Sequence, residues 1–211
     1  MDFTRPVEAL IPGVQGRVLG VLSRTEAQLT IRAVADLAGV SPRQASAVVA
    51  RLADLGVVER REVPPAVLVR LVPDNLAAET IMALARIRGR ALRRLADLAR
   101  MIRPRPAGLV VFGSFARGLA GPESDLDVLV VRPAGVSGMD DTWTETLGAW
   151  QHAASRLLGN PVQLLVVGSE ELPSLLRDGR GVWNEIRKEG LVLLGNDLEG
   201  LSRAPCPDAE T

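Results

Sequence analysis

Two aspartates separated by one residue stand at the start of an apolar run in the second half of the chain. Asp125 and Asp127 flank Leu126, and side chains two residues apart in a β-strand project from the same face of a sheet. Two carboxylates held so close resist joint ionisation unless a cation neutralises them. The pair therefore predicts a divalent cation site, with Mg²⁺ as the first choice because it binds carboxylate oxygens.

A Gly-Ser pair lies upstream of the two aspartates. Gly113-Ser114 follows the apolar run Leu109–Phe112, which predicts a short buried strand leading through a turn into a helix. Unpaired backbone N–H groups at a helix start, together with a small hydroxyl, can bind a phosphate group. Because bulky residues there would prevent close approach, the pair predicts a phosphate site opposite the carboxylates.

The segments around these residues alternate between strand and helix patterns. The predicted elements are strands at Leu109–Phe112, Leu126–Val131, Val162–Val167 and Leu191–Leu194, and helices after Gly113, over Trp143–Leu158, at about Glu171–Arg177 and near Val182–Lys188. Pro104-Arg105-Pro106 interrupts the preceding helical pattern, because proline lacks a backbone donor and disfavours helical geometry before it. A domain is therefore expected over residues 104–195, followed by a disordered tail at 196–211.

These segments together resemble a known superfamily. Gly113–Gly118, followed by Ser124–Val131, is similar to the signature of the minimal nucleotidyltransferases within the DNA polymerase β superfamily, and the resemblance covers about residues 105–195. It implies an α/β domain with a mixed sheet, in which Asp125 and Asp127 ligate Mg²⁺ and take part in catalysis. The residues that it assigns to binding an NTP, with ATP expected, are Gly113, Ser114, Arg117 and Ser124.

The resemblance also implies a reaction, from which this sequence departs at one position. An acceptor hydroxyl would attack the α-phosphate in line and expel pyrophosphate. Active members carry a third carboxylate on a later strand, where this chain has Gln163. An amide oxygen can ligate a metal but cannot accept the proton of the nucleophile, so transfer is expected to be weak or absent. Glu170 or Glu171 is either a substitute acid or an exposed helix cap, and we favour the cap.

The first half of the chain has the order helix, strand, helix, turn, helix, hairpin. The patterns predict a helix ending near Arg24, a strand at Leu29–Ile31, helices at about Arg32–Ala38 and from Pro42 to about Leu55, and hairpin strands at Val57–Arg61 and Val67–Leu71. In the turn, Gly39 suits a left-handed C-cap, and Ser41 suits an N-cap before a proline.

This order resembles the winged helix-turn-helix domains of bacterial transcription regulators. The resemblance covers about residues 10–72, within a domain expected at 1–72. It implies that the helix after the turn enters the major groove of double-stranded DNA, while the hairpin touches the backbone. The residues assigned to DNA binding are Ser41, then Arg43, Gln44 and Ser46 near base edges, and Arg51, Arg60 and Arg61 near phosphates. The alternative is a winged helix used only for protein contacts.

A single long helix is expected to connect the two domains over residues 73–103. Its apolar residues recur every three or four positions from Ile81 to Ile102, and its other face is rich in arginine. This arginine face is best explained as a solvated surface. The apolar stripe could mediate a homodimer or could pack against its own chain, and the sequence leaves both alternatives open.

Charge and composition set the broad class of the protein. Residues 1–103 hold 16 arginines and 10 acids (+6), whereas residues 104–211 hold 9 basic residues and 15 acids (−6). The basic half suits nucleic-acid phosphates and the acidic half suits divalent cations. No segment reaches the ~20 apolar residues needed to span a bilayer. The one cysteine, Cys206, fits a reducing compartment, so we expect a cytoplasmic protein without a membrane partner.

The sequence thus predicts an α+β chain with an N-terminal winged helix-turn-helix, a long connecting helix and a polymerase-β-like nucleotidyltransferase domain. The leading functional hypothesis is a DNA-binding transcriptional regulator whose second domain binds NTP and Mg²⁺. The alternative is an active Mg²⁺-dependent enzyme that moves an NMP onto a small molecule, a nucleic acid or a protein. A purely structural scaffold is a third hypothesis.

Overall fold

The computed structural model describes residues 1–195 and Gly200, and it divides the chain into two compact units. One unit contains Asp2 and Thr4–Ile87, and the other contains Met1, Phe3 and the chain from Arg88 onward. We refer to them as the winged-helix unit and the nucleotide unit and describe each by itself. The segment 196–211, expected to be disordered, lies outside the described residues apart from Gly200. None of the described helices is long and apolar enough to cross a bilayer.

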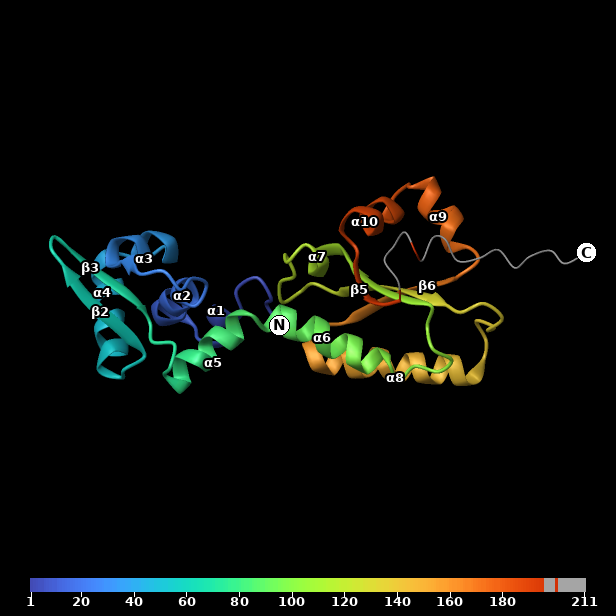
Figure 1. Ribbon diagram of the computed structural model, residues 1–211, viewed down its shortest axis with the longest axis horizontal. Coiled ribbons are helices and arrows are strands. Elements are labelled where there is room, and N and C mark those ends of the chain that lie inside the picture. Colours follow the sequence, from blue (N-terminus) through green and yellow to red (C-terminus); the bar gives the residue numbers. More distant parts are fainter. Residues whose placement is uncertain (196–199, 201–211) are drawn as a thin grey trace, which may run out of the picture. The chain divides into compact units, whose positions relative to one another are not determined.

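The winged-helix unit is a small helical domain with a three-stranded antiparallel sheet (Figure 1). Its elements are α1 (Pro6–Leu10), α2 (Gly13–Leu22), β1 (Leu29–Thr30), α3 (Ile31–Ala38), α4 (Pro42–Asp54), β2 (Val58–Val63), β3 (Ala66–Leu71) and α5 (Leu76–Ala85). The strand order is β1-β3-β2, so β3 is the central strand. The predicted order of elements is confirmed, with α1 as an additional short helix.

Local chemistry fixes the turn between α3 and α4. Thr30 caps α3 by accepting a hydrogen bond from Ala33 N, and Gly39 ends the helix in the left-handed region at φ +61°. Ser41 and Gln44 then form a capping box at the start of α4, in which each side chain satisfies a backbone N–H of the other. These caps determine where α4 begins, and therefore which of its residues face outward.

The segment expected as one connecting helix forms two helices, α5 and α6 (Ile87–Ala99), separated at Arg86. Arg86 has φ −97° and ψ 15°, which lies outside the helical region. The apolar stripe divides with the helix, because Ile81 and Leu84 pack on the core of the winged-helix unit while Leu95 is buried in the nucleotide unit. The stripe therefore packs within the chain. A homodimer remains a prediction.

The nucleotide unit is a mixed sheet with helices on both faces. It contains α6, β4 (Gly108–Phe112), α7 (Gly113–Ala116), β5 (Leu126–Arg132), α8 (Asp141–Leu158), β6 (Val162–Gly168), α9 (Leu172–Asp178), α10 (Val182–Glu189) and β7 (Leu191–Leu194). The strand order is β6-β5-β4-β7, with β6 parallel to β5 and the other neighbours antiparallel. Figure 1 shows α6 and α8 along one face of this sheet and α9 and α10 along the other.

The central strands of this sheet carry an apolar residue at nearly every position because both faces are covered. All five residues of β4 are buried, as are five of the seven residues of β5. Trp143 and Trp150 of α8 are also buried. Each buried side chain of this size contributes about 1.5–3 kcal/mol to folding. The core thus holds the ends of β4 and β5 in fixed register.

Candidate functional site

The two aspartates lie at the N-terminal end of β5, where that strand pairs with both of its neighbours. Asp125 immediately precedes the strand, and Asp127 is its second residue. Asp127 pairs with Phe112 across the antiparallel β4 and with Gln163 across the parallel β6. Three segments that are far apart in sequence therefore meet at one end of the sheet.

Gly113 brings the turn after β4 against the carboxylate of Asp127. Its φ of +68° lies in the left-handed region, which side chains other than glycine rarely adopt. A Cβ atom at this position would also collide with Oδ2 of Asp127. Ser114, the next residue, is half-buried and is the second residue of α7, which is four residues long. The structure thus brings the predicted Gly-Ser pair and the predicted aspartates together.

The electrostatic environment of Asp127 is that of an uncompensated carboxylate. Burial raises its pKa above the ordinary value, and the negative charges of Asp125 and Glu185 raise it further, while Arg117 lowers it. A bound divalent cation would favour the ionised form of both aspartates. The donor set therefore fits a metal ion that is attracted to paired carboxylates.

Few side chains near the two aspartates could ligate a metal ion. Within the part of the chain that the structure describes, no group of three or more His, Cys, Asp or Glu side chains could hold a metal ion. Mg²⁺ fits a site of this kind, because it is usually held by one or two carboxylates together with substrate phosphates and water. Asp125 and Asp127 would be the protein ligands, and the remaining oxygens would come from phosphate and solvent.

Arg117 lies at the C-cap of α7 and is paired with carboxylates of α10. Its Nη1 is 3.0 Å from Oε2 of Glu189 and 3.9 Å from Oε2 of Glu185. All three side chains are partly exposed, so each pair contributes little to stability. The pairs nevertheless orient the guanidinium close enough to Asp127 for its charge to lower the pKa of that residue.

Sequence reasoning missed Glu185 and Glu189. Their spacing of four residues places them on one face of a helix, and that signal is visible in the sequence. Which face of α10 turns toward Arg117 depends on how α10 packs against the sheet, where Ile186 is fully buried. That packing is a tertiary property, so the periodicity of α10 alone could not identify these two acids.

Gln163 lies beside the aspartates on the edge strand β6. Its Nε2 donates a hydrogen bond of 3.4 Å to Oδ2 of Asp125. Glu170 and Glu171 follow the opposite end of β6, because the strand runs from its pairing with Leu126 to its pairing of Gly168 with Arg132. Seven strand residues span roughly 20 Å, so neither acid can reach the aspartates. Glu171 occupies the N-cap position of α9 but makes no side-chain capping hydrogen bond.

Ser124, predicted to bind nucleotide, takes part in the turn before β5. Its hydroxyl accepts a hydrogen bond from Gly121 N. The buried side chain of Asn160, which the sequence analysis did not select, donates to the carbonyl oxygens of Gly121 and Ser124. Asn160 thus connects the turn before β6 with the turn before β5. It holds in place the segment from which Asp125 emerges.

The predicted DNA-contacting residues of α4 lie on its outward face. Ala45, Val48, Val49 and Leu52 are buried, whereas Ser41, Arg43, Gln44, Ser46 and Arg51 are exposed. The Oε1 atom of Gln44 accepts hydrogen bonds from the backbone N and the hydroxyl of Ser41. One end of this amide is therefore engaged in the helix cap, and only its Nε2 group is free of that cap.

Arg60 and Arg61 lie on β2, the edge strand of the hairpin. Both are exposed, and as consecutive strand residues they project from opposite faces. Only one of them can therefore point to the side of the hairpin that faces a given DNA backbone.

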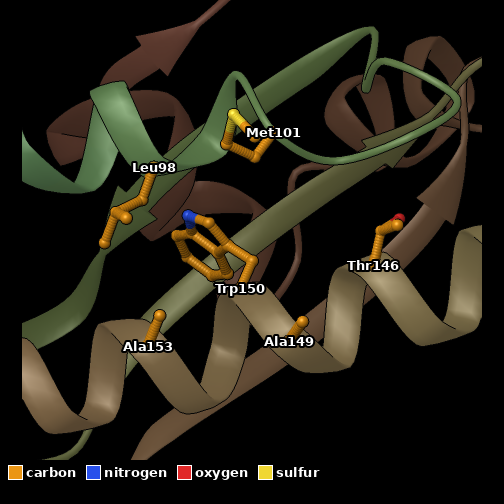
Figure 2. A pocket seen from close by; sticks show the side chains of 6 residues that line it. All are labelled: Leu98, Met101, Thr146, Ala149, Trp150 and Ala153. Atoms are coloured by element: carbon orange, nitrogen blue, oxygen red, sulfur yellow. The ribbon is translucent and has the colours of Figure 1, made fainter.

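A separate pocket lies between α6 and α8 of the nucleotide unit. It has a volume of 170 Å³ and an almost entirely apolar lining (Figure 2). The residues that line it are Leu98, Met101, Thr146, Ala149, Trp150 and Ala153. Figure 2 shows Trp150 and Thr146 rising from the same helix, with Met101 and Leu98 opposite. None of the candidate site residues contributes to this pocket.

Comparison with known proteins identifies both units. The model of the nucleotidyltransferase domain matches residues 92–180, and that of the MarR family matches residues 11–66. Among solved structures, a toxin–antitoxin with AMP-PNP is 17% identical, and a mutant of the toxin–antitoxin MntA-HpeT is 14% identical. Each match covers 53% of this chain and 80% of the other, with a TM-score of 0.37, too low to support an argument. No curated protein matches significantly.

The family matches agree with the two compact units. The MarR match lies wholly in the winged-helix unit, and the other match begins inside α6, which packs in the nucleotide unit. The chain therefore joins a winged-helix domain of the MarR type to a nucleotidyltransferase domain.

Proposed function

We propose that this protein is a DNA-binding transcriptional regulator whose nucleotidyltransferase domain binds an NTP with Mg²⁺ and transfers nucleotide weakly or not at all. The observation that carries the proposal is the pairing of Asp127 with Gln163 across β5 and β6. An amide stands beside the two aspartates, at the position where transfer chemistry calls for a proton acceptor. Among the described residues, the position beside the two aspartates therefore carries a group suited to ligand binding and not to proton transfer.

Nucleotide binding rests on the residues at the end of β5. Asp125 and Asp127 would hold Mg²⁺, which would neutralise charge on the phosphates of the nucleotide. Gly113 lets the turn after β4 approach the carboxylate of Asp127 closely, and Ser114 follows it with a small hydroxyl. Arg117 can contact phosphate only by exchanging at least part of its pairing with Glu185 and Glu189. ATP is the first nucleotide to test.

DNA binding rests on the MarR-type domain and on the exposed face of α4. Arg43 and Ser46 lie near the start of that helix with exposed side chains, and Arg51 lies about two turns after Arg43. A helix start in the major groove presents such residues to base edges. An arginine further along the helix reaches the backbone more easily and would bind phosphate. These residues are our candidates for DNA contacts.

Transfer requires a group that removes the proton of the acceptor hydroxyl. Gln163 cannot do so, because its amide is neutral and has no basic lone pair of sufficient strength. In the structure its N–H instead donates to Asp125. Glu170 and Glu171 lie at the far end of β6, so they cannot replace it.

Calorimetric titration of the full chain with each NTP in Mg²⁺ tests the ligand-binding half of the proposal. We expect saturable binding that is lost in Asp127→Ala, because this change removes a carboxylate of the cation site. Glu170→Ala is the matched control, since it removes a carboxylate beside the same strand at its other end. Equal binding by wild type and Asp127→Ala would contradict the assigned site.

A second experiment tests the regulatory half. Duplex DNA selected by the protein from a random pool is titrated with and without Mg·ATP. A regulatory link predicts a change in DNA affinity of about 5–150-fold, the usual range for coupled sites. The change should vanish in Asp127→Ala, whose basal DNA affinity should equal that of wild type. Identical affinity in both conditions would contradict regulation by nucleotide.

The alternative, an active nucleotidyltransferase, is favoured by the match to that domain. It is tested by incubating the protein with α-labelled NTPs and candidate acceptors. Under our proposal wild type transfers little label, and Gln163→Asp transfers more because it supplies a proton acceptor. Gln163→Asn is the matched control, since it keeps an amide. Strong transfer by wild type that Asp125→Ala abolishes would establish the enzyme instead.

A further inference from the structure

The chain passes between its two compact units near Phe3 and again at Arg88. Phe3 belongs to the nucleotide unit and Thr4 to the winged-helix unit, and the chain re-enters the nucleotide unit between Ile87 and Arg88. On the nucleotide-unit side, Phe3 and Arg88 both contact the segment Phe115–Ala120. This segment continues directly from Gly113-Ser114, so we name it the site loop.

Arg88 holds the site loop by its backbone. Its Nε donates a hydrogen bond of 2.9 Å to the carbonyl oxygen of Phe115, and its Nη2 donates to the carbonyl oxygen of Ala116. These carbonyls lie at the C-terminal end of α7, the helix that begins with Gly113-Ser114. The guanidinium also lies 5.9 Å from the centre of the Phe115 ring. One side chain thus holds two successive peptide units.

Phe3 contacts the same loop at two other points. Its ring meets that of Phe115 edge to face, with 4.8 Å between the centroids. Its backbone N donates a hydrogen bond of 2.9 Å to the carbonyl oxygen of Ala120. Phe115 is 1% exposed, so its ring, packed against that of Phe3, fixes the start of the site loop in the core.

Gly118 N and Arg88 both donate a hydrogen bond to the carbonyl oxygen of Phe115. Gly118 has φ +75°, and a Cβ atom there would lie 3.8 Å from the guanidinium of Arg88. A displacement of Arg88 would therefore remove one side-chain donor from each of two carbonyls at the end of α7, and would loosen the residues that follow Ser114.

We infer that Arg88 is a positioning residue for the site loop, and that nucleotide binding at this loop is linked through Arg88 to the α5–α6 junction around Arg86. The inference rests on the proposed nucleotide function and names the residue that would transmit it. Arg88 touches the loop rather than the ligand. It lies two residues after the break in the helix, at the point where the chain enters the nucleotide unit.

Hydrogen–deuterium exchange of the full chain, with and without Mg·ATP, tests this link. In wild type we expect slower exchange both in residues 113–120 and in the junction, residues 85–90. In Arg88→Ala, ATP should still protect residues 113–120 but no longer the junction. Arg88→Lys should behave like Arg88→Ala, because an ammonium lacks the planar fork that holds two carbonyls. Arg90→Ala, an exposed arginine on the same helix, is the matched control.

Two further readouts separate positioning from general stability. Without ATP, Arg88→Ala should exchange faster than Arg90→Ala in residues 113–120, while both keep the melting profile of the winged-helix unit. Loss of the two loop hydrogen bonds should weaken ATP binding about five- to tenfold.

The outcomes distinguish this inference from the proposed function. Protection of residues 113–120 without protection of the junction in wild type would overturn the link and leave nucleotide binding intact. Junction protection that persists in Arg88→Ala would overturn the role of Arg88. Absence of protection in both segments would overturn nucleotide binding and the link together.

Discussion

The outward face of α4 and the end of β5 are two candidate sites built in different ways. On α4 every candidate residue comes from one helix, is exposed and is positioned by the helix start at Ser41. At β5, the candidates come from α7, from the start of β5 and from β6, and the carboxylate of Asp127 is partly withdrawn from solvent. The first site is local, whereas the second exists only when the sheet has formed.

This difference predicts how each site responds to change. Substitutions on α4 should alter DNA binding and leave folding unaffected, because the exposed side chains support no core. Substitutions at the end of β5 should alter folding and ligand binding together, because the strands that form the core also hold the site. Three experiments test this distinction.

The largest effect is expected from Gly113→Ala. An alanine there adopts an unfavourable positive φ and displaces the carboxylate of Asp127, so we expect a loss of about 1–3 kcal/mol in the free energy of unfolding. Binding of Mg·ATP should weaken more than about tenfold, as when a well-placed charged group is lost. Chemical denaturation and calorimetry measure the two effects.

The variant Gly135→Ala separates the effect of backbone strain from the effect of the collision with Asp127. Gly135 has φ +78°, but a Cβ atom there would meet nothing within 4 Å. Its alanine variant should therefore lose stability through backbone strain alone and bind Mg·ATP like wild type. Weakened ATP binding in Gly135→Ala would show that the close approach to Asp127 is not the cause in Gly113→Ala.

Replacing arginines of α4 by alanine should change stability less, but should selectively change DNA affinity and site discrimination. Arg43→Ala should lower discrimination between cognate and altered sites by about 1–3 kcal/mol, as for a lost base contact. Arg51→Ala should weaken binding to all duplexes and reduce the salt slope by about one. Fluorescence anisotropy at several salt concentrations measures both, with Arg32→Ala on α3 as the control. Unchanged affinity and slope in both variants would favour a winged helix used for protein contacts.

The smallest effect concerns the pH dependence of stability. Because the pKa of Asp127 is raised in the folded protein, its contribution to stability is present below the ordinary pKa and is lost as pH rises through the raised value. In EDTA at neutral pH, Asp127→Asn should therefore be more stable than wild type, by less than about 1 kcal/mol because the group is partly exposed.

Thermal melts over a range of pH check this sign. The advantage of Asp127→Asn should shrink toward acidic pH, where Asp127 becomes neutral in both states. Addition of Mg²⁺ with ATP should stabilise wild type and reverse the order. A wild-type advantage that grows with pH in EDTA would contradict a raised pKa.

The order of helices and strands could be predicted from the sequence because most elements carry a clear periodicity and chemical caps. The mixed sheet and the joining of a winged-helix part to a nucleotidyltransferase part were implied by the family resemblances and are confirmed. The break between α5 and α6 was not predicted. The apolar stripe runs through Arg86 without a proline, and only its packing on two different cores shows why the helix divides.

The candidate site was predicted only in part. Asp125, Asp127 and Gly113 lie close to one another along the chain and in a recognisable pattern, so their proximity could be expected. Glu185 and Asn160 could not be selected, because their roles depend on contacts across 58 and 36 residues of chain, with Asp127 and Ser124 respectively. Such contacts leave no local pattern in the sequence.

By itself, the sequence determined local features of this protein: where most strands and helices lie, where α4 begins, and which two carboxylates stand at the start of one strand. These follow from backbone geometry and from the spacing of side chains within a single element. The tertiary structure alone decided that Gln163 lies beside Asp125, that Glu170 lies too far away, and that Arg88 holds the site loop. Register between strands and packing between helices fix those distances, and both arise only when the whole core is buried.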